Sequence, residues 1–398
     1  MGEAERVTRI YLALGWVFGF VMSTFGIAAT VAWVVEADLS ATQLILMGSV
    51  LEGTVLLFEV PTGVVADRYS RKWSIVISWA LIALGISGSL NTSFVVLMVA
   101  QFVWGVGFTF QSGAVTAWAT DQLGRDIDDL IVRQARARSI GVMSGVIVGA
   151  GVGWATNLFV AIGLAAAVAL ATSVYLAVVM PERVKPTGDD VADSPWQTAR
   201  SGWSVVSGYP IVRTVMIVAF LGGFGSEVID RLFTKRFIDL GVPVLEPVVM
   251  IAVIALVAQA GSWWVLGRIE RGVEVRPVTA RTVAVAYAVT CVACVALAVG
   301  PEFAIAAAGY FVMRISRETI EPLEAAIVNR RARSAERATI LSFHGQADAL
   351  GQATGGPTMA LVAFLTTQST AMAAGAAMFG IGAMVAAHRA REDEPSTV

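Results

Sequence analysis

Long apolar runs alternate with short polar segments along most of the chain. We count twelve runs, at residues 10–35, 42–66, 73–90, 94–120, 139–159, 160–180, 211–234, 246–267, 279–299, 302–328, 338–365 and 368–388. About 20 apolar residues cross a hydrocarbon core about 30 Å thick, so each run fits one membrane-spanning helix. The alternation of a membrane barrel is missing, and helices satisfy their own backbone polar groups in lipid. The pattern predicts an all-α membrane protein with twelve transmembrane helices.

One long polar segment divides these runs into two groups of six. Residues 181–210 contain charges and prolines but no apolar run of spanning length. We therefore expect an N-terminal six-helix bundle over residues 1–180, a cytoplasmic linker over 181–210 and a C-terminal six-helix bundle over 211–398. Trp196 and Trp203 within the linker fit either a short interfacial helix or an unstructured connection.

Composition and charge support a lipid environment. The chain is 56% hydrophobic and 15% charged, with a mean hydropathy of +0.72, whereas soluble domains have roughly 25% charged residues. A net charge of −2 without a basic face argues against nucleic acid as a partner. Lys and Arg concentrate in alternate loops, so the positive-inside rule places both termini in the cytoplasm. We expect a multi-pass protein of a bacterial cytoplasmic (inner) membrane.

The sharpest local motif lies between the second and third runs. A glycine, three residues, Asp-Arg, two residues and two basic residues are provided by Gly63, Asp67, Arg68, Arg71 and Lys72. This segment resembles the signature loop of the major facilitator superfamily, with Ser70 in place of a second glycine. The resemblance covers the whole chain and implies two six-helix halves around a central site, with this loop as a cytoplasmic gate.

The residues of this motif also suggest specific contacts. Gly63 is expected to let the second helix approach a neighbour closely. Asp67 is expected to lie against the N-terminus of another helix, where unpaired N–H groups favour an anion. Asp121, at the end of the fourth run, is expected to pair with Arg71 or Arg68 when the cytoplasmic side closes. An ordinary basic loop is the alternative explanation.

Gly145, Gly149 and Gly153 in the fifth run bear on the direction of transport. They resemble the glycine-rich motif of the superfamily's drug/proton antiporters, although Ala150 replaces its proline. Close helix packing explains the same glycines equally well. Segments 58–63, 112–121 and 226–232 resemble the bacterial multidrug-efflux branch, which implies export of amphipathic organic compounds in exchange for protons.

Ionisable residues inside the apolar runs are candidates for the central site. Each costs about 2.5–3.5 kcal/mol at mid-bilayer on insertion scales, so each needs a partner or water. The tenth run contains Arg314, Arg317, Glu318, Glu321 and Glu324, with Arg314–Glu318 and Arg317–Glu321 spaced to pair one turn apart and Glu324 expected in a static ion-pair stack. The other substrate-cavity candidates are Glu227, Asp230, Arg231 and His344.

Three carboxylates are candidates for proton coupling: Glu52, Asp348 and Glu59. Glu52 and Asp348 fall near mid-depth, where desolvation favours the protonated carboxyl and permits proton exchange near neutral pH. Either is also explained as a structural carboxylate bonded to a neighbouring helix. Asp348 is spaced to pair with His344. A single histidine makes no metal site, so we expect no metal and no cofactor.

These patterns together predict a secondary active transporter, not an enzyme. We expect a monomer in the lipid bilayer that acts on a small-molecule organic substrate and on protons. Proton-coupled export of amphipathic organic compounds or drugs is the main hypothesis. A proton-coupled importer of a small metabolite and a non-transporting receptor or scaffold are the alternatives.

Overall fold

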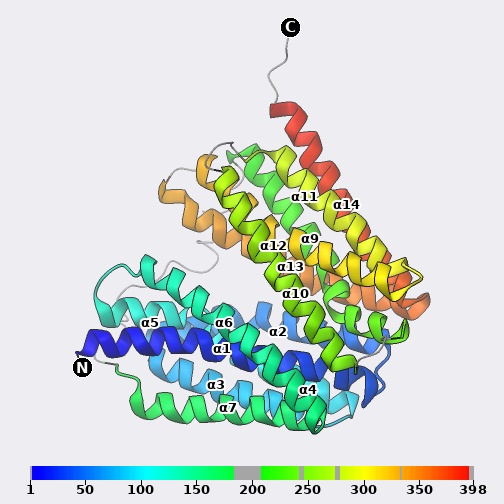
Figure 1. The fold of residues 1–398 in the computed structure, drawn as a ribbon. Helices are drawn as coiled ribbons and strands as arrows, with labels where there is room; N and C mark the ends of the chain where they lie inside the picture. The colour runs from blue at the N-terminus through cyan, green and yellow to red at the C-terminus, as the bar shows by residue number, and fades with distance from the viewer. Residues whose placement is uncertain (1, 183–207, 242–245, 274–277, 332–333, 394–398) are drawn as a thin grey trace. The chain divides into compact units, whose positions relative to one another are not determined.

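The computed structural model describes residues 2–182, 208–241, 246–273, 278–331 and 334–393. These residues form helices and, within the described ranges, no strand (Figure 1). The helices are α1 (Glu3–Val35), α2 (Ala41–Arg68), α3 (Arg71–Gly88), α4 (Phe94–Gln111), α5 (Ala114–Leu123), α6 (Asp128–Ala155), α7 (Leu158–Val179), α9 (Pro210–Asp239), α10 (Pro247–Val273), α11 (Ala280–Val299), α12 (Phe303–Arg331), α13 (Ser334–Leu365) and α14 (Gln368–Asp393). The predicted all-α fold is confirmed, and most of the expected linker, residues 183–207, lies outside the described residues.

The helices follow the apolar runs, and two differences are the largest. The fourth run is broken into α4 and α5, because Gly113 has φ = +71°, a left-handed conformation that interrupts the helix. The fifth predicted span corresponds to α6. This helix begins at Asp128, eleven residues before the expected start at 139, because a polar segment continues the same helix. Polar residues extend a helix beyond the apolar run that identifies it, so apolarity alone misplaces its ends.

Within the described ranges, nine helical segments are long and apolar enough to cross a membrane, with α4 and α5 taken together. Three helices that the apolar pattern predicted as spans fall short of this criterion. The 18 residues of α3 begin with Arg71 and Lys72. Charged and polar residues interrupt the apolar sequence of α12 and α13.

The chain divides into two compact units with the same internal arrangement. The first unit contains α1, α3 to α7, most of α2 and the first turns of α10, and the second contains α9, α11 to α14, most of α10 and the first turns of α2. In the first unit, α1 packs on α6 and α7, and α3 packs on α4 and α7. In the second unit, α9 packs on α13 and α14, and α11 packs on α12 and α14. Each of these pairs has a counterpart in the other unit, in the same chain order.

The α1–α6 pair of the first unit is held together backbone to backbone. A Cβ atom added to any of three glycines of α6 would meet the main chain of α1: Gly141 at Trp16, Gly145 at Phe20 and Gly149 at Thr24. The hydroxyl of Thr24 donates to the carbonyl oxygen of Gly145 at 3.2 Å. Two of the three glycines of the antiporter-like motif therefore serve close packing, whereas Gly153 lies against Leu158 of the next helix.

The α9–α13 pair of the second unit repeats this contact. Gly351 and Gly355 of α13 lie against the carbonyl oxygens of Phe220 and Phe224 of α9. The spacing of one helical turn on both helices matches that of the α1–α6 pair. The two units thus share a glycine-mediated helix pair as well as a helix order.

A methyl group added at these contacts should destabilise the protein. In Gly145→Ala, the new Cβ would overlap the main chain of α1, and overpacking of this kind costs about 1–3 kcal/mol. Gly151→Ala is the matched control, because a Cβ there would meet no described heavy atom within 4 Å. Thermal unfolding in detergent should show a lower Tm for Gly145→Ala only, and equal Tm values for the two variants would contradict the close contact.

Candidate functional site

A polar cavity of about 240 Å³ lies within the second unit. It is surrounded by α9, α11, α12, α13 and α14, and its polar lining consists of Ser226, Tyr287, Arg317, Glu321, Glu324, His344 and Asp348. Four of these, Arg317, Glu321, His344 and Asp348, are sequence-predicted site residues that the fold brings to one place. The structure also assigns Glu324 to this wall and adds Tyr287.

Glu324 is the most deeply buried of the cavity's charged residues, with 1% of its surface exposed. Its Oε2 lies 2.6 Å from Nε2 of His344. Its Oε1 lies 3.0 Å from the hydroxyl oxygen of Tyr287. The Tyr287 hydroxyl also lies 2.7 Å from the carbonyl oxygen of Val218 on α9. The carboxyl group of Glu324 thus links α12 to α11 and α13, and its expected place in a static ion-pair stack stays a prediction.

The pairing along α12 also differs from the expected pattern. Arg314 pairs with Glu318 at 2.9 Å, as the one-turn spacing predicts. Arg317 does not pair with Glu321 but reaches across to Asp230 on α9 at 2.7 Å. Glu321 is exposed in the second unit, whereas Asp230 lies where Arg317 supplies its counter-charge. The interhelical pair satisfies two interior charges at once.

The remaining candidates of the second unit are also satisfied locally. Glu227 is buried on α9 and pairs with Arg231 one turn away at 2.8 Å. Asp348 is half-buried on α13 and accepts a hydrogen bond from Nε2 of Gln352 at 2.6 Å. The spacing of His344 and Asp348 suggests that they pair, but His344 bonds to Glu324 instead.

Glu52 and Glu59 belong to the first unit. Glu52 is half-buried on α2. Glu59 is exposed on the same helix, and its Oε1 accepts a hydrogen bond from the hydroxyl of Ser112 at 3.0 Å, next to the break between α4 and α5. A coupling role for either residue stays a prediction.

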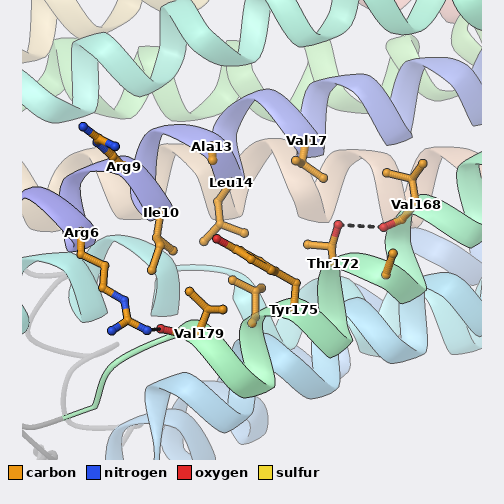
Figure 2. Close-up of a pocket in the computed structure, with 12 residues that line it drawn as sticks. Arg6, Arg9, Ile10, Ala13, Leu14, Val17, Val168, Thr172, Tyr175 and Val179 are labelled. Carbon is orange, nitrogen blue, oxygen red and sulfur yellow. Dashed lines mark hydrogen bonds between the residues drawn. The ribbon is translucent and has the colours of Figure 1, made fainter. Parts of the chain in front are cut away.

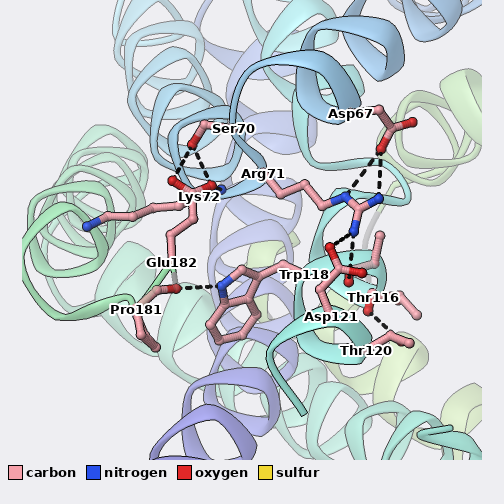
Figure 3. A network of polar contacts seen from close by, with 11 residues as sticks. Asp67, Ser70, Arg71, Lys72, Thr116, Trp118, Thr120, Asp121, Pro181 and Glu182 are labelled. Atoms are coloured by element: carbon pink, nitrogen blue, oxygen red, sulfur yellow. Dashed lines mark hydrogen bonds and ion pairs between the residues drawn. The ribbon is translucent and has the colours of Figure 1, made fainter. Parts of the chain in front are cut away.

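The signature loop, Gly63 to Lys72, places Arg71 between two carboxylates (Figure 3). Arg71 contacts Asp67 one turn earlier, with Nε and Nη2 each 3.2 Å from Oδ1. Its Nη1 forms an ion pair with Asp121 on α5, the partner that the sequence suggests. Arg68 is exposed, and a Cβ at Gly63 would meet no described heavy atom within 4 Å, so the expected close approach at Gly63 is not seen.

Ser70, the departure from the family motif, caps α3. Its hydroxyl accepts a hydrogen bond from the Trp73 N–H at 3.0 Å. It donates to Glu182 at 2.7 Å (Figure 3). Glu182 also accepts from the Lys72 N–H at 3.1 Å, so a carboxylate lies at the start of α3, where the helix dipole favours it. Sequence reasoning missed Glu182 because it lies more than 100 residues from this loop.

The repeat between the units places different side chains at equivalent positions of the two units. Gly19 and Arg138 of the first unit make the same close main-chain contact as Gly223 and Asp348 of the second. One residue before these glycines stand Phe18 in α1 and Gly222 in α9. The Phe18 ring fills this position, with Arg138 stacked 4.6 Å from its centroid.

Gly222 leaves the equivalent position open, and Tyr287 occupies it. A Cβ on Gly222 would lie 2.9 Å from the Tyr287 hydroxyl oxygen. Where the first unit has the aromatic ring of Phe18, the second unit therefore has the Tyr287 hydroxyl group, which can reach Glu324. Sequence reasoning missed Tyr287, because its contact with Gly222 joins two helices that lie far apart in the chain.

A larger groove, about 510 Å³, lies between α1 and α7 in the first unit (Figure 2). Its lining is mainly apolar, and Arg6 donates a hydrogen bond to the carbonyl oxygen of Val179 at one end. Since no carboxyl group of the described residues lines it, this groove does not offer the chemistry of the cavity in the second unit.

The family model described as Major Facilitator Superfamily matches residues 12–356. The chain belongs to this superfamily. It is 31% identical over 103 residues to an uncharacterised transporter of the Major Facilitator Superfamily type, YxaM, from Bacillus subtilis (strain 168). That match spans 24% of the chain and 24% of the relative.

Solved structures support the same fold over nearly the whole chain. The nucleoside transporter NupG superposes with a TM-score of 0.76 at 14% identity, covering 98% of this chain and 99% of NupG. A bacterial homologue of the human lysosomal transporter Spinster, in an inward-facing and unoccupied conformation, gives 0.74 at 15% identity, with 100% of both chains covered. A POT family transporter in complex with a thioalcohol-conjugated peptide gives 0.75 at 11% identity, with 96% of both covered. At these identities the likeness shows the fold alone.

The corrected pairing of Arg317 can be tested by a double-mutant cycle. Arg317→Ala leaves Asp230 without its counter-charge, so it should lower stability in detergent more than the Arg317→Ala, Asp230→Ala double variant does. We expect a coupling of about 0.5–3 kcal/mol for this pair and close to zero for Arg317 with Glu321. Additive losses for Arg317 and Asp230 would refute the interhelical pair.

Proposed function

We propose that this protein is a proton-coupled transporter that exports amphipathic organic compounds by alternating access. The observation that supports it best is the cavity in the second unit, where three carboxyl groups, Glu321, Glu324 and Asp348, line an internal space together with His344 and one arginine. Such groups are expensive inside a helix bundle that lies in lipid, and their presence at one cavity marks a pathway for protons or charged substrate.

The architecture supports alternating access. Two units with the same helix order, each held by a glycine-mediated helix pair, are the parts that rock about a central site in transporters built from repeats. We place twelve spans and both termini on the cytoplasmic side of a bacterial inner membrane, with halves 1–180 and 211–398 joined by the linker at 181–210. The transporter acts as a monomer in this proposal.

The signature loop serves as the cytoplasmic gate. Arg71, held between Asp67 and Asp121, connects the end of α2 to α5 through side chains that are only partly buried. An ion pair at that depth keeps access to water, so its partners can separate without leaving a bare charge in lipid. Gating thus proceeds by exchange of partners around Arg71.

Export is favoured over import by the resemblance to drug/proton antiporters in segments 58–63, 112–121 and 226–232. A proton-coupled importer of a small metabolite is the second candidate, and it would use the same carboxyl groups. The two differ in the sign of the flux that a proton gradient drives.

The direction of transport can be read in everted membrane vesicles with ethidium as the probe. An exporter that exchanges protons for dye should accumulate ethidium in vesicles with an acidic lumen, and vesicles from cells without the protein give the baseline. Loss of accumulated dye under the same gradient would indicate import instead. No protein-dependent flux with any amphipathic probe tested would reject the export proposal.

Neutral variants of the coupling carboxyl groups should distinguish gradient-driven accumulation from downhill movement of the dye. Asp348→Asn and Glu52→Gln should each abolish gradient-driven accumulation while downhill dye movement persists, because the carboxyl can no longer take up and release a proton. Glu302→Gln, in an exposed position between α11 and α12, is the control and should transport like the wild type. Gradient-driven accumulation in both test variants would exclude Asp348 and Glu52 as coupling residues.

A further inference from the structure

Three side chains at the base of the cavity form one hydrogen-bonded chain. His344, Glu324 and Tyr287 come from α13, α12 and α11, and the chain ends at the carbonyl oxygen of Val218 on α9. Glu324 and Tyr287 are each 1% exposed. This hydrogen-bonded chain runs across four helices of the second unit. Each of its groups has a known number of donors and acceptors, so its hydrogen atoms can be assigned by counting them.

The count at Tyr287 requires a hydrogen from Glu324. A phenol has one hydrogen, and the Tyr287 hydroxyl has two oxygen neighbours, Val218 O at 2.7 Å and Glu324 Oε1 at 3.0 Å. A backbone carbonyl only accepts, so the phenol hydrogen goes to Val218. An ionised carboxylate also only accepts, which would leave two oxygen atoms facing each other without a hydrogen. A protonated Glu324 removes this conflict by donating to Tyr287.

The other end of the chain is compatible with this assignment. Nε2 of neutral His344 donates its hydrogen to Oε2 of Glu324, which accepts in both protonation states. Each of the three contacts then has one hydrogen, and no charge is buried. The charged groups that share the cavity are Glu321 and Arg317 from α12 and Asp348 from α13, while Ala219, Gly222 and Ser226 from α9 and Phe379 from α14 are uncharged.

We propose that Glu324 is a proton-holding residue of the second unit and that Tyr287 responds to its protonation state by rotating its hydroxyl group. With the proton on Glu324, the phenol hydrogen points to Val218. When the proton leaves, the phenol O–H, which keeps its hydrogen, donates to the carboxylate instead, and its hydrogen bond to Val218 breaks. The net step moves one proton off Oε1 of Glu324 and transfers no other group.

This switch changes a contact between helices. The Tyr287–Val218 hydrogen bond joins α11 to α9, and Gly222 is the residue that gives the hydroxyl room to reach that carbonyl. Loss of the bond on deprotonation loosens α11 from α9. The inference rests on the proposed function in identifying this proton with the transported one, whereas the site itself is independent of transport.

Infrared difference spectroscopy of the purified protein in lipid, between acidic and alkaline pH, tests the site without any substrate. The wild type should show a protonated-carboxyl band at neutral pH that is lost in Glu324→Gln. Glutamine is uncharged and of the same shape, and its amide can accept from His344 and donate to Tyr287, so this variant should fold. Glu302→Gln is the control and should retain the band.

Tyr287→Phe provides a second measurement that does not depend on the Glu324 variant. It removes the acceptor of the Glu324 proton, so the band should remain but shift in frequency. A band of unchanged intensity in Glu324→Gln, an unshifted band in Tyr287→Phe, or no protonated carboxyl at neutral pH in the wild type would each overturn the proposal.

Transport of ethidium in everted vesicles separates this inference from the proposed function. Glu324→Gln should lose gradient-driven accumulation and keep downhill movement. If the band belongs to Glu324 but the variant still accumulates dye against its gradient, the held proton is not the coupled one. If the wild type shows no proton-driven flux, the proposed function fails while the infrared assignment stands.

Discussion

Charge inside an apolar helix bundle must be compensated within that bundle, and the second unit is organised around this constraint. A bare charge there costs several kilocalories per mole, so each interior ion needs a partner, water or a proton. Arg317 has Asp230, Arg231 has Glu227, and Arg314 has Glu318. Glu324 differs from these carboxylates, because its bonded neighbours are a tyrosine and a histidine. For a buried carboxyl group whose bonded neighbours have no fixed charge, gaining a proton removes the cost of burying a charge.

The two units show how one helix arrangement serves two purposes. Their shared glycine contacts fix the distance between α1 and α6 and between α9 and α13, so the neighbouring side chains decide what each interior holds. Phe18 stands in the first unit at the position that Gly222 takes in the second, where the Tyr287 hydroxyl lies close to it. The glycine-mediated helix contacts are thus repeated in the two units, whereas the side chains beside them differ. A duplicated fold is expected to keep its helix contacts and to change the residues that line its interior.

The fold was largely predictable from the sequence, and the site only in part. Apolar runs long enough to span lipid locate nearly every helix, because length and hydropathy are local properties. The break at Gly113 escaped this reading, since a single residue with positive φ leaves apolarity unchanged. Pairs one turn apart, such as Arg314 with Glu318, are also readable. Contacts between distant helices are not, and for this reason Arg317 was assigned to Glu321, Glu324 was undervalued, and Tyr287 and Glu182 were missed.

The proton site also bears on how a buried group can influence motion. A proton on Glu324 changes no backbone position by itself, and a conformational effect requires a contact whose strength differs between the two states. The Tyr287–Val218 bond is such a contact, because one phenol hydrogen serves either the carbonyl on α9 or the carboxylate on α12, but not both. A hydrogen bond of this kind contributes about 0.5–1.5 kcal/mol. That is too little to drive a full conformational change alone, yet it biases an equilibrium between two nearly balanced states up to about tenfold, so the geometry fits a regulator of a pre-existing equilibrium.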